Sequence, residues 1–169
     1  MTHPLIVAAE SMDWTEVGPE GETFRRKQLG GATDDADLGC SLYDVPPETA
    51  TWRRHFHAAN AEAIYVLEGS GEIELGPEGA IETLEPGTYV ALPPDERGTH
   101  RVVAGDEGVV FLAVSTMRDP DVTVYPDAEM VGLYAGAPPG GDREKRTLST
   151  FLDADATVEY WERSADPPR

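Results

Sequence analysis

Three of this chain's four histidines are spaced so that a small β-barrel could bring them onto one metal ion. His55 and His57 lie two residues apart, which places both imidazoles on the same face of a β-strand. Glu62 opens the next expected strand, and His100 lies at the start of a distant one. Imidazole and carboxylate groups bind divalent transition metals. We therefore predict a metal site of His55, His57, Glu62 and His100, in which Glu62 also serves as a catalytic proton carrier.

The segment from His55 to Gly69 resembles the first signature of the cupin superfamily, in which His-x-His is followed by Glu and then by Gly. The second signature is matched by Gly87 to Pro93 followed by His100, with a loop two residues longer than usual. The resemblance covers roughly residues 38 to 117. It implies an all-β fold with a single cupin β-barrel, an antiparallel jelly-roll-like double sheet.

The chain itself carries strand signals in the same region. From about Glu22, short β-branched and aromatic runs alternate with turn residues, which is typical of an all-β sandwich or barrel. A tight hairpin turn is expected at residues 68–71, because glycine adopts positive φ easily. One further strand is expected at 157–161. The other strands are predicted near residues 22–29, 38–45, 51–57, 62–68, 71–75, 80–84, 88–92, 100–104 and 108–116.

A length of 169 residues suits one domain. We expect residues 1–37 to form an N-terminal extension with one edge strand, residues 38–117 the barrel, and residues 118–169 an extended C-terminal tail that packs on it. An edge strand at 22–29 leaves backbone groups uncovered, and such edges are often paired in symmetric dimers. This favours a homodimer.

The chain is strongly acidic, with 32 Asp and Glu against 13 Lys and Arg and a net charge of −19. Concentrated salt screens such self-repulsion, so the composition favours a halophilic protein over an ordinary acidic one. The one basic cluster, residues 25–27, is too short to indicate a nucleic-acid partner. No apolar stretch of about 18 residues indicates a membrane span, and no signal peptide is evident, so we expect a cytoplasmic protein.

Strand alternation also predicts which side chains line the pocket, because residues two apart share a face. Arg53 aligns with the histidine pair and is either a substrate carboxylate ligand or a partner of a neighbouring acid. The remaining predicted lining is mostly apolar. The full predicted substrate-binding set is Arg53, Ile64, Val66, Tyr89 and Val102.

Three histidines and one glutamate leave open positions on a five- or six-coordinate ion, and catalysis needs such positions. The ion is Zn, Fe, Mn, Ni or Cu, and the donor set does not choose among them. We consider two main hypotheses. One is a metal-dependent oxygenase or isomerase acting on a small organic molecule, and the other is a non-catalytic sensor that binds a sugar or aromatic acid. A metal-free epimerase-like barrel leaves Glu62 unexplained.

Overall fold

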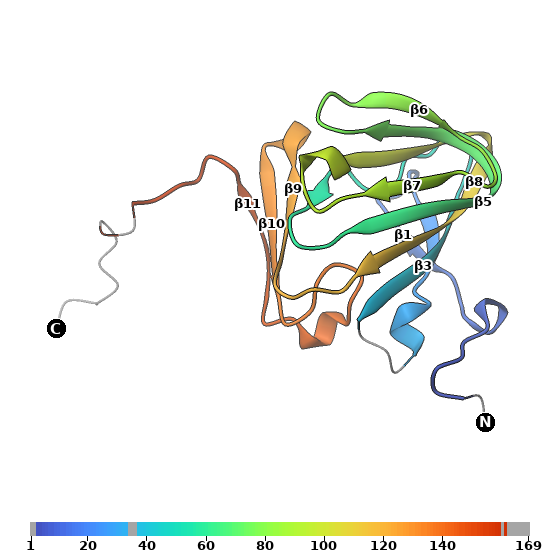
Figure 1. The fold of residues 1–169 in the computed structure, drawn as a ribbon, viewed down its shortest axis with the longest axis horizontal. Helices are drawn as coiled ribbons and strands as arrows, with labels where there is room; N and C mark the ends of the chain where they lie inside the picture. Colours follow the sequence, from blue (N-terminus) through green and yellow to red (C-terminus); the bar gives the residue numbers. More distant parts are fainter. Residues whose placement is uncertain (1–2, 34–36, 160, 162–169) are drawn as a thin grey trace.

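The computed structural model describes residues 3–33, 37–159 and 161, and its regular structure is almost entirely β (Figure 1). The strands are β1 (Thr15–Val17), β2 (Phe24–Lys27), β3 (Leu38–Val45), β4 (Phe56–His57), β5 (Glu62–Leu75), β6 (Ala80–Leu84), β7 (Tyr89–Leu92), β8 (His100–Thr116), β9 (Asp121–Tyr125), β10 (Met130–Ala135) and β11 (Leu148–Asp153). The short 3-10 helices are η1 (Ala9–Ser11), η2 (Gly30–Ala32), η3 (Glu96–Gly98), η4 (Pro126–Ala128) and η5 (Arg143–Lys145).

The strands form two antiparallel sheets. The seven-stranded sheet has the order β1-β2-β3-β8-β5-β6, and β7 also pairs with β5. The four-stranded sheet has the order β11-β10-β9-β4. Figure 1 shows β9 to β11 as an upright layer beside the larger sheet. The predicted all-β, antiparallel double-sheet fold is confirmed.

Two predicted strands, at 38–45 and 80–84, have the predicted bounds, but the hairpin turn at residues 68–71 is wrong. The chain runs straight through as the 14-residue strand β5, with register shifts between Val66 and Glu68 and between Gly69 and Gly71. A β-bulge also uses a glycine with positive φ, so the same residue signal fits both structures. Gly69 has φ +73° at this bulge. Likewise, the strands predicted at 100–104 and 108–116 form one strand, β8.

The expected strand at 51–57 is mostly irregular, and only Phe56–His57 pair as a strand. The expected strand at 157–161 is also wrong where the structure describes it, because residues 157–159 and 161 lie outside any strand. Residue 160 lies outside the described residues. Nor is the edge at 22–29 uncovered, since β1 pairs with β2.

The segment after Met117, which we expected to be a tail on the barrel, supplies β9, β10 and β11 to the four-stranded sheet. Its first strand, Asp121–Tyr125, alternates buried and partly exposed side chains, as a strand with one covered face does. This segment therefore helps to build the layer that faces the predicted site. Within the described residues, no helix has the length and apolar character needed to span a membrane.

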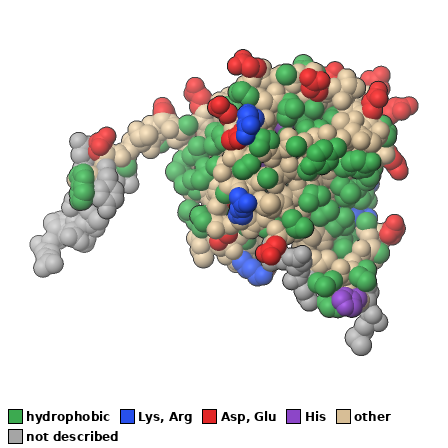
Figure 2. All heavy atoms as spheres, viewed as in Figure 1, with side chains coloured by type: hydrophobic (Ala, Val, Ile, Leu, Met, Phe, Trp, Pro, Cys, Tyr) green, Lys and Arg blue, Asp and Glu red, His purple; other side chains and the backbone are tan. Residues whose placement is uncertain are grey.

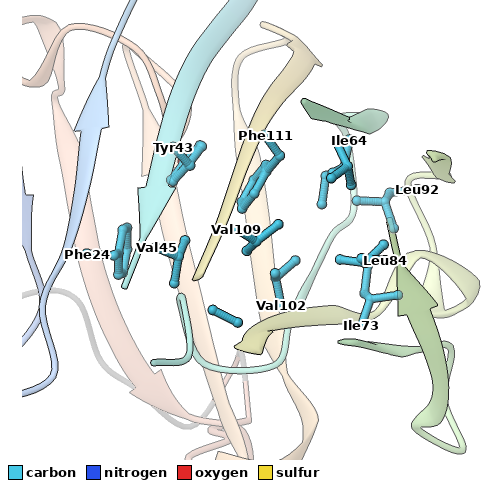
Figure 3. Packing of buried hydrophobic residues seen from close by; sticks show 12 residues of the cluster. Phe24, Tyr43, Val45, Ile64, Ile73, Leu84, Leu92, Val102, Val109 and Phe111 are labelled. Atoms are coloured by element: carbon cyan, nitrogen blue, oxygen red, sulfur yellow. The ribbon is translucent and has the colours of Figure 1, made fainter. Parts of the chain in front are cut away.

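The core lies on the inner face of the larger sheet, where side chains of β2, β3, β5 and β8 meet (Figure 3). Tyr43 and Phe111 stack with ring centroids 4.9 Å apart. This hydrophobic core fixes the positions of the strands that carry the predicted metal ligands. Its members are Phe24, Tyr43, Val45, Ile64, Val66, Ile73, Leu84, Leu92, Val102, Ala104, Val109 and Phe111.

The bulge in β5 can be tested with alanine at Gly69. A Cβ there would lie 2.1 Å from the Gly108 carbonyl oxygen, in addition to the cost of φ +73°. Gly76 has the same φ of +73° but nothing within 4 Å of its Cβ, so it is a matched control. We expect Gly76→Ala to cost about 1–2 kcal/mol of unfolding free energy and Gly69→Ala clearly more, measured by urea unfolding. Equal losses of unfolding free energy in the two variants would contradict the close backbone approach at the bulge.

The acid excess predicts that salt stabilises the fold. Figure 2 shows acidic side chains spread around the rim of the face in view, with few basic ones between them. Screening weakens the repulsion among them, so the melting temperature should rise steadily from dilute buffer to molar KCl. A flat or falling melting curve would show that this repulsion does not limit stability.

Candidate metal centre

The His55 and His100 side chains are brought together by a pair of backbone hydrogen bonds. The His55 amide donates to the His100 carbonyl at 3.1 Å, and the His100 amide donates to the His55 carbonyl at 2.8 Å. Residues directly opposite in an antiparallel pair project their side chains to the same side. The two imidazole centroids lie 4.7 Å apart as a result. Two residues that are distant in sequence thus become neighbours.

His57 and Glu62 complete the cluster from two further strands. His57 lies in β4, where it pairs with Thr123 of β9, and Glu62 is the first residue of β5. Glu62 Oε2 lies 3.7 Å from His57 Nε2 and 3.6 Å from His100 Nε2. The candidate ligand atoms of His55, Glu62 and His100 all lie within 4.8 Å of one another. The structure therefore brings all four predicted ligands together, with His57 at the margin of the tightest group.

Two of the imidazoles are oriented by backbone carbonyls. His55 Nδ1 lies 2.7 Å from the Arg53 carbonyl oxygen, and His100 Nδ1 lies 2.9 Å from the Gly98 carbonyl oxygen. A carbonyl oxygen only accepts hydrogen bonds, so each Nδ1 carries the hydrogen. Each Nε2 then keeps its lone pair. Ligating histidines are commonly fixed by such a bond from the other ring nitrogen.

His57 is oriented by a carboxylate that the sequence reasoning missed. Its Nδ1 donates to Asp121 Oδ2 at 2.6 Å, while Asp121 Oδ1 accepts from the Ala59 amide at 3.1 Å. Asp121 is only 1% exposed. Burial raises the pKa of Asp121, but the hydrogen bond and charge of His57 outweigh it, so the net pKa is lowered. An acid opening the alternating run 121–125 was the available sequence signal.

Burial lowers the pKa of each imidazole, and the neighbouring charges decide whether the net shift is down or up. It is the main reason that the pKa of His55 lies well below its usual range, with added repulsion from His100 and His57. Burial also lowers the pKa of His100, against the attraction of Glu62. Burial acts on His57 too, but the Asp121 hydrogen bond and the charges of Glu62 and Asp121 raise its pKa overall. His55 and His100 are therefore held neutral, as metal ligands must be.

The four side chains line a cavity of about 1520 Å³ between the sheets. Of the predicted substrate-binding residues, Arg53, Ile64 and Val102 line it. Val66 lies instead in the core at 0% exposure, and Tyr89 is 65% exposed on the outer face. Pairing explains the Tyr89 placement, because Val90 is opposite the inward Ile64, so the residues on either side of Val90 face outward.

Two tyrosines on the cavity wall were also missed. The Tyr125 ring stacks on His55 with centroids 5.6 Å apart, and Tyr134 is buried in the neighbouring strand β10. Burial and the neighbouring Tyr134 raise the pKa of Tyr125 far above its usual range. The Tyr125 phenol is thus a neutral hydrogen-bond donor beside the histidines. Both residues lie between the strands predicted at 108–116 and 157–161, where no strand was predicted, so alternation did not place them.

Comparison with known proteins agrees with this architecture. Residues 41–115 match the family model described as the cupin domain. An L-ectoine synthase from Desulfatibacillum aliphaticivorans is 32% identical over 130 residues, which is 77% of this chain and 95% of that protein. An L-ectoine synthase from Oceanobacillus iheyensis is 27% identical over 55% of this chain and 71% of that protein.

Solved structures show the same fold. A sugar phosphate isomerase of the cupin superfamily from Silicibacter pomeroyi superposes with a TM-score of 0.73 at 21% identity, covering 90% of this chain and 94% of its own. KdgF from Halomonas sp. gives a TM-score of 0.53 at 26% identity, covering 66% of this chain and 94% of its own. With its double sheet, its His-x-His and Glu signature and these relatives, the chain belongs to the cupin superfamily.

Proposed function

We propose that this protein is a metal-dependent enzyme acting on a small organic molecule. The observation that carries the proposal is the convergence of His55, His57, Glu62 and His100 on one cavity wall, with the Nδ1 atoms of all three imidazoles already engaged. Three nitrogen donors and one carboxylate suit Zn, Fe, Mn, Ni or Cu. The donor set and its orientation therefore fit one divalent transition ion.

A bound ion of this kind supplies Lewis-acid polarisation of a substrate carbonyl. The protein's own groups would do the rest. Glu62 is partly exposed and faces the histidines, so its carboxylate is placed both to hold an ion and to carry a proton. The Tyr125 hydroxyl can donate a hydrogen bond to a substrate oxygen, and Ile64 and Val102 form an apolar wall that limits access of water.

Isomerase-type chemistry is the favoured reaction class, because it needs only a polarised carbonyl and a proton carrier. One solved structure with the same fold carries the name of a sugar phosphate isomerase. Oxygenase chemistry and simple ligand binding are the competing outcomes. Assembly as a homodimer and a cytoplasmic location remain predictions.

The function test follows proton exchange in the metal-loaded protein. With pyruvate, 2-oxoglutarate and fructose 6-phosphate in D₂O, an isomerase-type site should replace hydrogens next to the carbonyl by deuterium, seen by proton NMR. Glu62→Gln should abolish that exchange. Oxygen uptake without exchange would instead favour an oxygenase, and saturable binding with neither would favour the binding-protein alternative.

Formation of L-ectoine is a second candidate activity, because the relative that this chain covers to 95% has that name. The assay supplies the substrate of the L-ectoine synthase relatives to the metal-loaded protein and measures ectoine by NMR. Turnover lost in His100→Ala would assign the activity to this centre. Absence of product would mean that this chain shares the fold of that relative but not its activity.

Removing one donor should remove the metal and keep the fold. We expect His57→Ala to lower the affinity for Zn²⁺ or Mn²⁺ at least 10-fold in competition with a chelating dye, since one donor and its Asp121 support are lost. His3→Ala, an exposed histidine outside the cluster, is the matched control. Wild-type affinity in His57→Ala would refute the role of His57.

Asp121 should matter without touching the metal. Asp121→Asn keeps the size of the side chain but removes the charge that holds His57 in its Nδ1–H form, so we expect a 10- to 100-fold loss of metal affinity. Asp127→Asn removes a surface carboxylate paired with Arg54 and should leave the affinity unchanged. Equal effects of the two substitutions on metal affinity would argue that the Asp121–His57 hydrogen bond does not support metal binding.

Metal affinity should fall with decreasing pH. Protons compete with the ion for the imidazoles, and His57 is protonated first because its pKa is raised, whereas those of His55 and His100 are lowered. The decline should therefore begin at or above the ordinary histidine value of about 6.5. Affinity that is constant from pH 8 to pH 5 would contradict imidazole ligation.

A further inference from the structure

Basic side chains are concentrated in the cavity of this acidic protein. Among the residues that the structure describes, five basic side chains line the cavity but only three acidic ones, although the chain has 32 acidic residues against 13 basic ones. The basic lining residues are Arg26, Arg53, Arg143, Lys145 and Arg146, and the acidic ones are Glu62, Asp119 and Asp142. A positive cavity in a chain of net charge −19 concentrates anions where the rest of the surface repels them.

The cavity arginines also lack the acidic partners that most other arginines have. Arg25, Arg54, Arg97 and Arg101 each have a carboxylate within 4.0 Å. In the described part of the chain, no carboxylate lies that close to the four cavity arginines, and Arg118 is the one other described arginine of this kind. Carboxylates are plentiful here, so four unpaired guanidinium groups in one cavity leave binding capacity for an outside anion.

Three of these arginines form a cluster, which we define as Arg26, Arg143 and Arg146. Burial lowers the pKa of Arg146, and the positive charges of Arg143 and Arg26 lower it further, although Tyr134 acts in the opposite direction. The geometry agrees, because all three line one cavity. Arg146 bonds to the carbonyls of residues 137 and 138, and Arg26 reaches the Gly140 carbonyl of the same loop through Gln28. An anion placed among these groups would relieve the repulsion on Arg146.

The cluster is held in place by neutral groups. Arg146 donates from Nε to the Ala137 carbonyl at 3.1 Å and from Nη2 to the Pro138 carbonyl at 2.9 Å. Arg26 Nη2 donates to Gln28 Oε1 at 3.1 Å, and Gln28 Nε2 in turn donates to the Gly140 carbonyl. These bonds fix the guanidinium groups of Arg26 and Arg146 without neutralising them, and preorganised charge lowers the entropy cost of binding.

One aromatic wall connects the cluster with the metal centre. The Arg146 guanidinium lies 5.1 Å from the centroid of the Tyr134 ring. Tyr134 neighbours Tyr125, whose ring stacks on His55. All four residues line the same cavity. A small molecule can thus be held at one end by arginines and present its other end toward the histidines.

We propose that the substrate is a small organic anion, bearing a carboxylate or phosphate group, and that Arg26, Arg143 and Arg146 bind this group in the cavity. Guanidinium groups bind both types of oxyanion through paired N–H donors. The direction of the substrate, with its reacting end toward the histidines, rests on the proposed function. The anion site itself does not.

The test measures anion binding by calorimetry on chelator-treated protein at constant ionic strength. The probes are inorganic phosphate and succinate, and the tighter one identifies the preferred oxyanion. We expect 1:1 saturable binding to the wild type. The double variant that combines Arg26→Gln with Arg143→Gln should bind at least 10-fold more weakly. Arg118→Gln, which removes an unpaired arginine outside the cavity, should leave the affinity unchanged. Arg146→Lys keeps the charge and controls for folding, and it should bind more weakly than wild type because the paired donors are lost.

Equal weakening by Arg118→Gln, or no saturable binding of either probe to the wild type, would overturn the anion site. Because these measurements use metal-free protein, they succeed or fail independently of the metal centre. If the anion site holds while the wild-type protein takes up no divalent ion, the proposed metal function is at fault. If metal binding holds but neither anion binds, the substrate class is at fault.

Discussion

The whole site depends on one short backbone pairing, between His55 and His100. His100 begins β8, which lies in the middle of the seven-stranded sheet, whereas His55 immediately precedes β4, an edge of the four-stranded sheet. The two hydrogen bonds of this pair therefore join the sheets at the candidate metal centre. The pairing continues along β8, where the Thr51 amide donates to the Val102 carbonyl and the Ala104 amide donates to the Thr49 carbonyl, each at 2.9 Å. Together these bonds place His100 beside the His55 and His57 pair.

Electrostatics then divides the molecule into two regions. The chain is rich in acids, while the cavity collects arginines, tyrosines and neutral imidazoles. Burial keeps His55 and His100 uncharged, and the buried Asp121 carboxylate orients His57. One cavity would thus bind a cation at the histidines and an anion at the arginines. This arrangement favours a substrate with two chemically different ends.

Sequence reasoning found the features that depend on local spacing. The two-residue strand repeat pairs His55 with His57, and the resemblance to the two cupin signatures adds Glu62 and His100, so all four could be named without a structure. The glycine signal was ambiguous, because a glycine with positive φ at position 69 fits a bulge as well as a hairpin turn. Tyr89 was assigned to the wrong face of its strand, because the pairing with β5 decides which residues of β7 face inward. Asp121 reaches His57, and Tyr125 and Arg146 reach the cavity, only through pairings distant in sequence or through tertiary packing.

The central claim is that three imidazoles and one carboxylate bind a single divalent ion. X-ray absorption at the metal edge tests it most directly, on protein purified without chelator or affinity metal and then loaded to saturation. We predict one ion per chain with imidazole scattering from three histidines, falling to two in His57→Ala. A first shell without imidazole, or protein that takes up no ion, would contradict the account.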